Sequence, residues 1–361
     1  MLFHFFTSLV DQYSFFNVFK YLTFRTGLSV MTSLVVVFII GSPLIKIFSE
    51  KMIAGPIRQD GPIDHIIKKS GTPTMGGVII IIGIISSTLL WADLKNVYVW
   101  TLIFVSLSLG GLGLLDDILK IKLKNSSGLK SRYKFTGQLI ISSLALYILI
   151  EYSNHEYLYD LYFPFFKNLI LHLGLFFIPF GLFVIIGASN AVNLTDGLDG
   201  LATVPVMLVA LSFTLISYVV GNTIFSEYLQ IQYIPDVGEL SIFCGSIVGA
   251  CLGFLWYNAP PAKIFMGDTG SLSLGGSLAA IAIIVKHEIV LAIVGGLFVL
   301  ETISVIIQVI SFKLTGKRIF KMAPIHHHFE KKGWAESTIV IRFWIIAIIL
   351  ALVGLATLKL R

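Results

Sequence analysis

The sequence predicts an all-α, polytopic membrane protein with about ten transmembrane helices and no separate soluble domain. Hydrophobic residues make up 56% of the 361 residues and charged residues only 13%, whereas an ordinary soluble domain has roughly 25% charged residues. A span needs about 20 mostly apolar residues. We expect spans at about residues 26–47, 74–92, 97–115, 134–151, 168–189, 200–221, 240–258, 270–286, 289–312 and 338–358.

The distribution of Lys and Arg predicts the orientation of these spans. Such residues accumulate in loops that stay in the cytoplasm, and the loops after the first, third, fifth, seventh and ninth spans, with the adjoining span ends, carry 19 of the 26. We therefore expect both termini outside and these five loops inside. The net charge of +6 reflects this asymmetry and suits anionic lipid headgroups, so it does not indicate nucleic-acid binding.

The N-terminal segment and the cysteines carry no chemistry of their own. Residues 1–25 are rich in Phe but are interrupted by Asp11 and Lys20, so we expect an interfacial helix rather than a signal peptide. Cys244 and Cys251 lie in one predicted span. Seven helical positions separate them by about 10.5 Å, which exceeds the reach of a disulfide, and we interpret both as packing residues.

An acidic turn, NLTDGLDG at Asn193–Gly200, separates two long uncharged runs. A simple turn between spans needs glycine or asparagine, but it does not need two carboxylates. If the second half of the turn is helical, Asp196 and Asp199 share a face, and Gly197 leaves the backbone open to a ligand. The alternative is a solvated hairpin in which Asp196 caps the next helix.

A second candidate site is the start of the second span, where Lys69 precedes GTPTMGG at Gly71–Gly77. Lysines followed by glycines at the mouth of a helix suit a phosphate group. The alternative is an ordinary cytoplasmic cluster of cations before a glycine-rich packing face.

Asp116 and Asp117 lie at the inner end of the third span. In the middle of a bilayer the pair would cost roughly 5 to 7 kcal/mol, so we expect it at the interface or bound to a partner. The two side chains could form a site together with Asp196 and Asp199, or they could only offset the six cations that follow them.

The loop at Tyr257–Ser271 ends one span and begins the next. Asp268 could be the N-cap of the eighth span, but an aspartate at a helix start also suits a Mg²⁺ ion that bridges phosphates. Phe265 could belong to the core or stack on a planar base.

Three consecutive histidines, His326–His328, follow a proline in the last inside loop. Adjacent side chains converge poorly on one metal ion, so contacts to phosphate or sugar groups fit better. Two other polar residues, Glu301 inside the ninth span and His172 near the outer end of the fifth, would suit a transport path. However, almost all the polar motifs lie on one side.

Taken together, the motifs resemble those of the phospho-N-acetylmuramoyl-pentapeptide transferases, within the polyprenyl-phosphate sugar-1-phosphate transferase superfamily. The resemblance runs from the first span to Lys359, and five ordered motifs carry it. They are GTPTMGG at Gly71, LLDD at Leu114, SNAVNLTDGLDGLA at Ser189, YNAPPAKIFMGDTGS at Tyr257 and MAPIHHHFE at Met322.

The resemblance implies that undecaprenyl phosphate attacks the β-phosphate of UDP-N-acetylmuramoyl-pentapeptide, with Mg²⁺ required, so that UMP leaves and lipid I forms. It also implies a homodimer in the bacterial cytoplasmic membrane with the active site facing the cytoplasm. By the same resemblance, Asp268 is a catalytic residue and the Mg²⁺ ligand, and Asp116 and Asp117 act on the acceptor phosphate or in catalysis. The implied substrate-binding residues are Lys69, Asn193, Asp196, Gly197, Leu198, Asp199, Asn258, Lys263, Phe265, His326, His327 and His328.

Two alternatives remain at the level of the sequence. The donor could be another nucleotide sugar, such as UDP-N-acetylglucosamine, although the histidine run favours a muramoyl-pentapeptide donor because relatives with other donors vary there. The chain could also be a transporter or channel. Within the leading hypothesis, direct in-line attack competes with a two-step route in which an aspartate carries the phospho-sugar.

Overall fold

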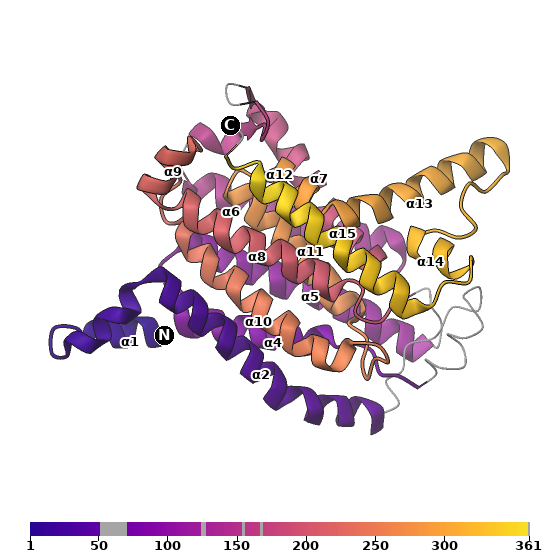
Figure 1. The fold of residues 1–361 in the computed structure, drawn as a ribbon, viewed down its shortest axis with the longest axis horizontal. Helices are drawn as coiled ribbons and strands as arrows, with labels where there is room; N and C mark the ends of the chain where they lie inside the picture. The colour runs from indigo at the N-terminus through magenta and orange to yellow at the C-terminus, as the bar shows by residue number, and fades with distance from the viewer. Residues whose placement is uncertain (51–70, 124–127, 154–155, 167–168, 360–361) are drawn as a thin grey trace.

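The computed structural model describes residues 1–50, 71–123, 128–153, 156–166 and 169–359. Over this part of the chain the protein is a bundle of long helices (Figure 1). The spans expected from the sequence correspond to α2 (Leu22–Glu50), α4 (Gly77–Trp91), α5 (Val97–Leu123), α6 (Ser131–Ser153), α7 (Phe177–Thr195), α8 (Thr203–Val220), α10 (Leu240–Asn258), α11 (Gly267–Ile284), α12 (Glu288–Val294) with α13 (Gly296–Thr315), and α15 (Glu336–Ala356).

Nine of the described helices are long and apolar enough to cross a membrane, and α4 is a shorter apolar helix of 15 residues. The prediction of an all-α polytopic membrane protein is therefore confirmed. The remaining elements are short: α1 (Leu2–Ser8), η1 (Ser14–Lys20), η2 (Glu156–Tyr159), β1 (Asp160–Tyr162) antiparallel to β2 (Ile170–His172), η3 (Gly174–Phe176), α9 (Thr223–Leu229), η4 (Val237–Glu239) and α14 (Ile325–Glu330).

Helix α11 forms the centre of the bundle. Every residue from Asp268 to Ile284 is buried, and the helix packs mainly against α5 and α7, while α10 packs against α2 and α8. Its sequence is rich in Gly, Ser and Ala, which permit close approach of neighbouring helices inside a membrane. Because protein rather than lipid surrounds α11, its modest hydropathy is tolerated.

Glycines set the distance between α11 and its neighbours. A Cβ atom added at Gly77 would lie 2.0 Å from the Gly270 nitrogen, and one at Gly113 would lie 2.2 Å from the Asp268 carbonyl oxygen. Helices α4 and α5 therefore contact the first turn of α11 backbone to backbone. This contact brings the acidic end of α5 to Asp268.

The ninth span departs from the prediction. The sequence predicts one helix over 289–312, but the structure has the short α12, a break at Gly295, and then α13. In Figure 1, α13 diverges from the bundle toward α14. The paired glycines Gly295 and Gly296 explain the break, because glycine weakens a helix interior.

The two chain ends lie at the end of the bundle opposite to the sequence motifs (Figure 1). The Met1 amino group donates to the Leu89 carbonyl, and Lys359 donates to the Tyr228 carbonyl. Residues 2–20 form the two short helices α1 and η1, not one helix. Cys244 and Cys251 are buried free thiols, which confirms that they are packing residues.

Candidate active site

Three aspartates and two lysines meet where α5, α6 and α11 approach one another. Asp116 and Asp117 of α5 are 2% and 3% exposed, and Asp268 of α11 is 9% exposed. Lys120 Nζ lies 3.0 Å from Asp116 Oδ2 and 2.9 Å from Asp268 Oδ2. Lys134 Nζ lies 2.6 Å from Asp268 Oδ2 and 3.4 Å from Asp116 Oδ2. We call these five residues the carboxylate–lysine cluster.

The local sequence explains part of this convergence. Lys120 follows Asp116 by four positions and Asp117 by three, so it is a neighbour of each of the two aspartates on the surface of α5. Lys134 comes from α6, beyond the next connection. The Leu129 amide also donates to Asp116 Oδ1, which fixes the chain just before α6 against the same carboxylate.

Asp117 has a different set of partners from Asp116. Its Oδ1 accepts from the Asp268 amide at 3.2 Å, and its Oδ2 accepts from the Thr269 amide at 3.0 Å and the Thr269 hydroxyl at 2.8 Å. These amides belong to the first turn of α11, which has no partners within its own helix for them. Asp117 therefore caps α11 from a neighbouring helix. Asp268 lies inside that first turn and is not the N-cap, which is Met266.

The acidic turn contributes Asn193 and Asp196 to the surroundings of Asp268. Asn193 Nδ2 donates to Asp268 Oδ1 and to the Ser271 hydroxyl, both at 2.8 Å. Removal from water raises the pKa of Asp196 to about 7, and the neighbouring carboxylates of Asp268 and Asp117 act in the same direction. Burial and the nearby carboxylates thus favour the neutral form of Asp196 beside Asp268.

The turn itself is not helical. Helix α7 ends at Thr195, and residues 196–202 form turns and a bend before α8, so Asp196 and Asp199 do not share a helical face as the sequence suggested they could. Asp199 Oδ2 instead accepts from the Ala262 amide, and the Asp199 amide donates to Glu336 Oε1. The Leu198 side chain is buried in an apolar cluster with residues of α13 and α15.

Asn258 ties the acidic turn to the following loop. Its Oδ1 accepts from the Gly200 amide and the Thr203 hydroxyl, and its Nδ2 donates to the Ile264 carbonyl. Its side chain is buried, with 2% exposure. Asn258 therefore positions two of the motifs relative to each other.

The GTPTMGG motif pairs with the loop before α11. The Gly76 and Gly77 amides donate to the Phe265 and Met266 carbonyls, and the Phe265 amide donates to the Pro73 carbonyl. These glycine amides are therefore occupied by protein partners. Lys263 is exposed and the Phe265 side chain is partly buried, while Lys69 lies outside the described residues.

The three histidines occupy three different environments. His326 is fully buried, with its Nδ1 3.1 Å from Glu301 Oε1. His327 Nδ1 lies 2.5 Å from Glu330 Oε2, and His328 Nδ1 accepts from the Lys321 amide at 3.0 Å. Burial lowers the pKa of His328, and Lys332 and Lys321 add to this effect. The other histidine in question, His172, pairs with Asp160 in the hairpin at the far end of the bundle.

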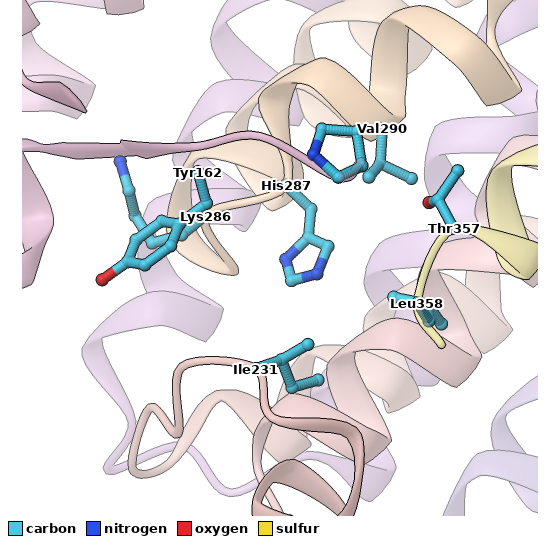
Figure 2. A pocket seen from close by; sticks show the side chains of 8 residues that line it. Tyr162, Ile231, Lys286, His287, Val290, Thr357 and Leu358 are labelled. Atoms are coloured by element: carbon cyan, nitrogen blue, oxygen red, sulfur yellow. The ribbon is translucent and has the colours of Figure 1, made fainter. Parts of the chain in front are cut away.

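A separate pocket lies at the far end of the bundle and contains none of the predicted site residues. Figure 2 shows the His287 ring at the centre of the residues that line it, which include Ile231, Thr357 and Leu358. Lys286 also lines this pocket, but its charge is paired with Glu288 at 2.7 Å. The carboxylate–lysine cluster is therefore the stronger candidate for phosphate chemistry.

Comparison with known proteins identifies the relatives of this chain. Residues 99–286 match the model of glycosyl transferase family 4, and residues 69–81 match phospho-N-acetylmuramoyl-pentapeptide-transferase signature 1. Two proteins called phospho-N-acetylmuramoyl-pentapeptide-transferase are similar over the full length of both chains. The one from Pelagibacter ubique (strain HTCC1062) is 68% identical over 361 residues, and the one from Maricaulis maris (strain MCS10) is 54% identical over 371 residues. The chain belongs to the phospho-N-acetylmuramoyl-pentapeptide-transferase family.

Membership in the phospho-N-acetylmuramoyl-pentapeptide-transferase family makes the chain a membrane-embedded transferase. The transporter alternative has no support from these relatives. The match to glycosyl transferase family 4 begins in α5 and ends just after α11, so it includes Asp116, Asp117 and Asp268.

Three residues of the site were not predicted from the sequence of this family member: Lys120, Lys134 and Glu336. The spacing of Lys120 from Asp116 could have identified it, because positions four apart on a helix are neighbours. No spacing rule could have identified Lys134 or Glu336, since each contacts its partner across more than a dozen residues of chain.

The carboxylate–lysine cluster also fits a hard divalent cation. Among the described residues, no three His, Cys, Asp or Glu side chains are grouped so that they could hold a metal ion by themselves. Mg²⁺, however, commonly uses one or two carboxylates together with phosphate oxygens and water. Asp116 and Asp268 share two ammonium partners, so this position already holds positive charge between carboxylates.

Proposed function

We propose that the protein transfers phospho-N-acetylmuramoyl-pentapeptide from its UDP-linked donor to undecaprenyl phosphate, which releases UMP and forms lipid I. The relatives' names supply the transferred group. The single structural observation that supports this chemistry is the convergence of Asp116, Asp268, Lys120 and Lys134 at one end of the bundle. A lipid acceptor requires a site at such a membrane surface.

The reaction needs positioning and charge neutralisation more than covalent chemistry. The attacking oxygen belongs to the lipid phosphate, the bond that forms joins it to the β-phosphorus of the donor, and the bond that breaks releases UMP. Lys120 and Lys134 would pair with phosphate oxygens of the two substrates. Asp116 would orient the lipid phosphate and accept a proton from its monoanion.

Asp117 has a positioning role in this proposal. Both of its oxygens accept hydrogen bonds from the first turn of α11, so it holds the Asp268 backbone in place. This arrangement favours direct attack over a two-step route with Asp117 as the nucleophile. A covalent phospho-sugar adduct trapped on the intact protein would contradict the direct route.

Asp268 would hold Mg²⁺, together with phosphate oxygens and water, and Asp116 is the second carboxylate in reach. When bound, the metal ion would neutralise charge on the diphosphate. Asn193, which donates to Asp268 Oδ1, would fix the carboxylate so that its other oxygen faces the substrates.

The remaining residues would bind the donor around this centre. Phe265 and the backbone of the acidic turn would face the uridine and diphosphate, as would Lys69 and Lys263, and His327 and His328 would contact the sugar and peptide. The site would face the cytoplasm of a bacterial inner membrane, because the cation-rich loops lie at this end. We also propose a homodimer, which sedimentation of the detergent-solubilised protein would test.

The deciding experiment measures UMP release by purified protein with undecaprenyl phosphate and Mg²⁺. We expect release with UDP-N-acetylmuramoyl-pentapeptide and none with UDP-N-acetylglucosamine. Release only with the second donor would keep the assigned chemistry but overturn the donor. No release with either donor, from protein that unfolds cooperatively, would overturn the proposed function.

A further inference from the structure

Glu301 is a fully buried acid that the proposed reaction does not use. Its carboxylate lies in α13 with no exposed surface, and His326 Nδ1 lies 3.1 Å from its Oε1. Among the described residues, neither the Glu301 oxygens nor the His326 ring nitrogens have a hydrogen-bond partner, so the two groups are linked by the closeness of Oε1 and Nδ1. A buried carboxylate is costly in a membrane protein unless it has a partner, so the two groups depend on each other.

The opposite edge of the His326 ring faces the acidic turn. A Cβ atom added at Gly197 would lie 2.3 Å from His326 Nε2, so a residue without a side chain is required where the ring contacts the turn. The His326 ring also lies against the ring of His327, with centroids 4.1 Å apart. His326 therefore touches both the turn that carries Asp196 and the histidine expected to contact the donor.

The segments on either side of the His326 ring are anchored by apolar packing. Leu198, the residue after Gly197, belongs to an apolar cluster that includes Leu297 of α13 and Phe343 of α15. Ile325, which precedes His326, packs against the same cluster, so the acidic turn and α14 share one apolar base. With Nδ1 3.1 Å from Glu301 Oε1, the arrangement that we propose has the ring proton on Nδ1, as carboxylates favour for histidines at metal sites.

We propose that Glu301 is a positioning residue for the nucleotide-sugar donor and acts through His326. It holds the ring between Gly197 and His327, so that the acidic turn and α14 keep a fixed separation. This role rests on the proposed function, because it assigns donor binding to those two segments. It gives His326 a supporting role instead of the direct donor contact expected from the sequence.

The test compares Glu301→Gln with Glu288→Gln, which alters another buried acid of the ninth span at the far end of the bundle. We expect Glu301→Gln to raise the KM for the donor about tenfold and to change kcat by less than about twofold. This pattern is typical when an interaction made equally in the ground state and the transition state is lost. Glu301→Asp keeps the carboxylate, so its KM for the donor should rise less than that of Glu301→Gln. Glu288→Gln should lower thermal stability but leave the KM unchanged.

Hydrogen exchange provides a readout that needs no substrate. Exchange in Glu301→Gln should accelerate in peptides that contain residues 193–200 and 325–330, and it should stay unchanged in α11. An unchanged KM with unchanged exchange in these peptides would overturn the proposal. Failure of the wild-type protein to release UMP would instead refute the proposed function and leave the exchange result interpretable.

If Glu301→Gln does not fold, nitrogen NMR of the wild-type protein labelled in histidine decides the question. We expect one strongly protected histidine with a proton on Nδ1. A protected histidine with its only proton on Nε2 would overturn the proposal.

Discussion

At the scale of single residues, adjacent acids of one sequence motif have different partners. Asp116 faces two ammonium groups, whereas Asp117 accepts from the start of α11. Neighbouring helical positions point about 100° apart, so one turn of α5 can serve both the substrate side and the packing side. The sequence identified the pair, but it could not assign the two roles because the partner atoms come from α11 and α6.

This difference predicts opposite phenotypes for two conservative variants. Asp117→Asn replaces one acceptor oxygen with an amide donor that faces backbone N–H groups, and it should destabilise the protein by about 1–3 kcal/mol. Asp116→Asn should abolish turnover while the melting temperature stays close to that of the wild type. Thermal unfolding and UMP release, measured on both variants, test this assignment. A stable Asp117→Asn variant would contradict the capping role.

Asp268→Asn should reduce Mg²⁺-dependent UMP release by roughly 10²- to 10³-fold, the typical loss when one preorganised electrostatic group is removed. The fold should persist, because the asparagine keeps one oxygen that can accept from Lys134 or from Asn193, and the backbone amide of residue 268 still donates to Asp117. A Mg²⁺ titration of the rate is the measurement. The matched control is Asp160→Asn, an aspartate in the hairpin at the far end of the bundle, which should keep full activity. Near-normal turnover of Asp268→Asn at ordinary Mg²⁺ would remove this residue from the ligands.

At the scale of helices, apolar run length predicted where the spans lie, but not how they contact each other. The span expected at 270–286 is α11 at Gly267–Ile284, and the small difference matters because it places Asp268 inside the first turn. The break at Gly295 was missed, since hydropathy averaged over about twenty residues does not respond to two glycines. Which glycines touch another backbone depends on the packing partner, and sequence alone does not give that partner.

The contact between α5 and α11 can be tested with two glycines of the same helix. Gly113→Ala places a methyl group against the Asp268 carbonyl, whereas an added Cβ at Gly111 meets nothing within 4 Å. Gly113→Ala should separate the helices, lower stability by about 1–3 kcal/mol and suppress UMP release. Gly111→Ala should behave like the wild type in unfolding and activity assays. Equal behaviour of the two variants would mean that this contact does not position the site.

At the scale of the whole molecule, the bundle separates its two ends chemically. The carboxylate–lysine cluster and the three histidines His326–His328 lie at one end, and both chain termini lie at the other. From the positive-inside rule we propose that the first end faces the cytoplasm, where a nucleotide-linked donor would be available.

This orientation predicts which engineered cysteines react from outside the cell. Cys244 and Cys251 are fully buried, so the wild-type protein should not react with a membrane-impermeant maleimide, and no cysteine-free background is needed. Tyr228, 67% exposed in α9, marks the end that carries the termini, and the exposed Lys317 marks the motif end. In intact spheroplasts Tyr228→Cys should be labelled and Lys317→Cys should not, whereas lysis should expose both. The reverse pattern would put the carboxylate–lysine cluster outside the cytoplasm, where a UDP-linked donor would not reach it, and the proposed function would fail together with the orientation.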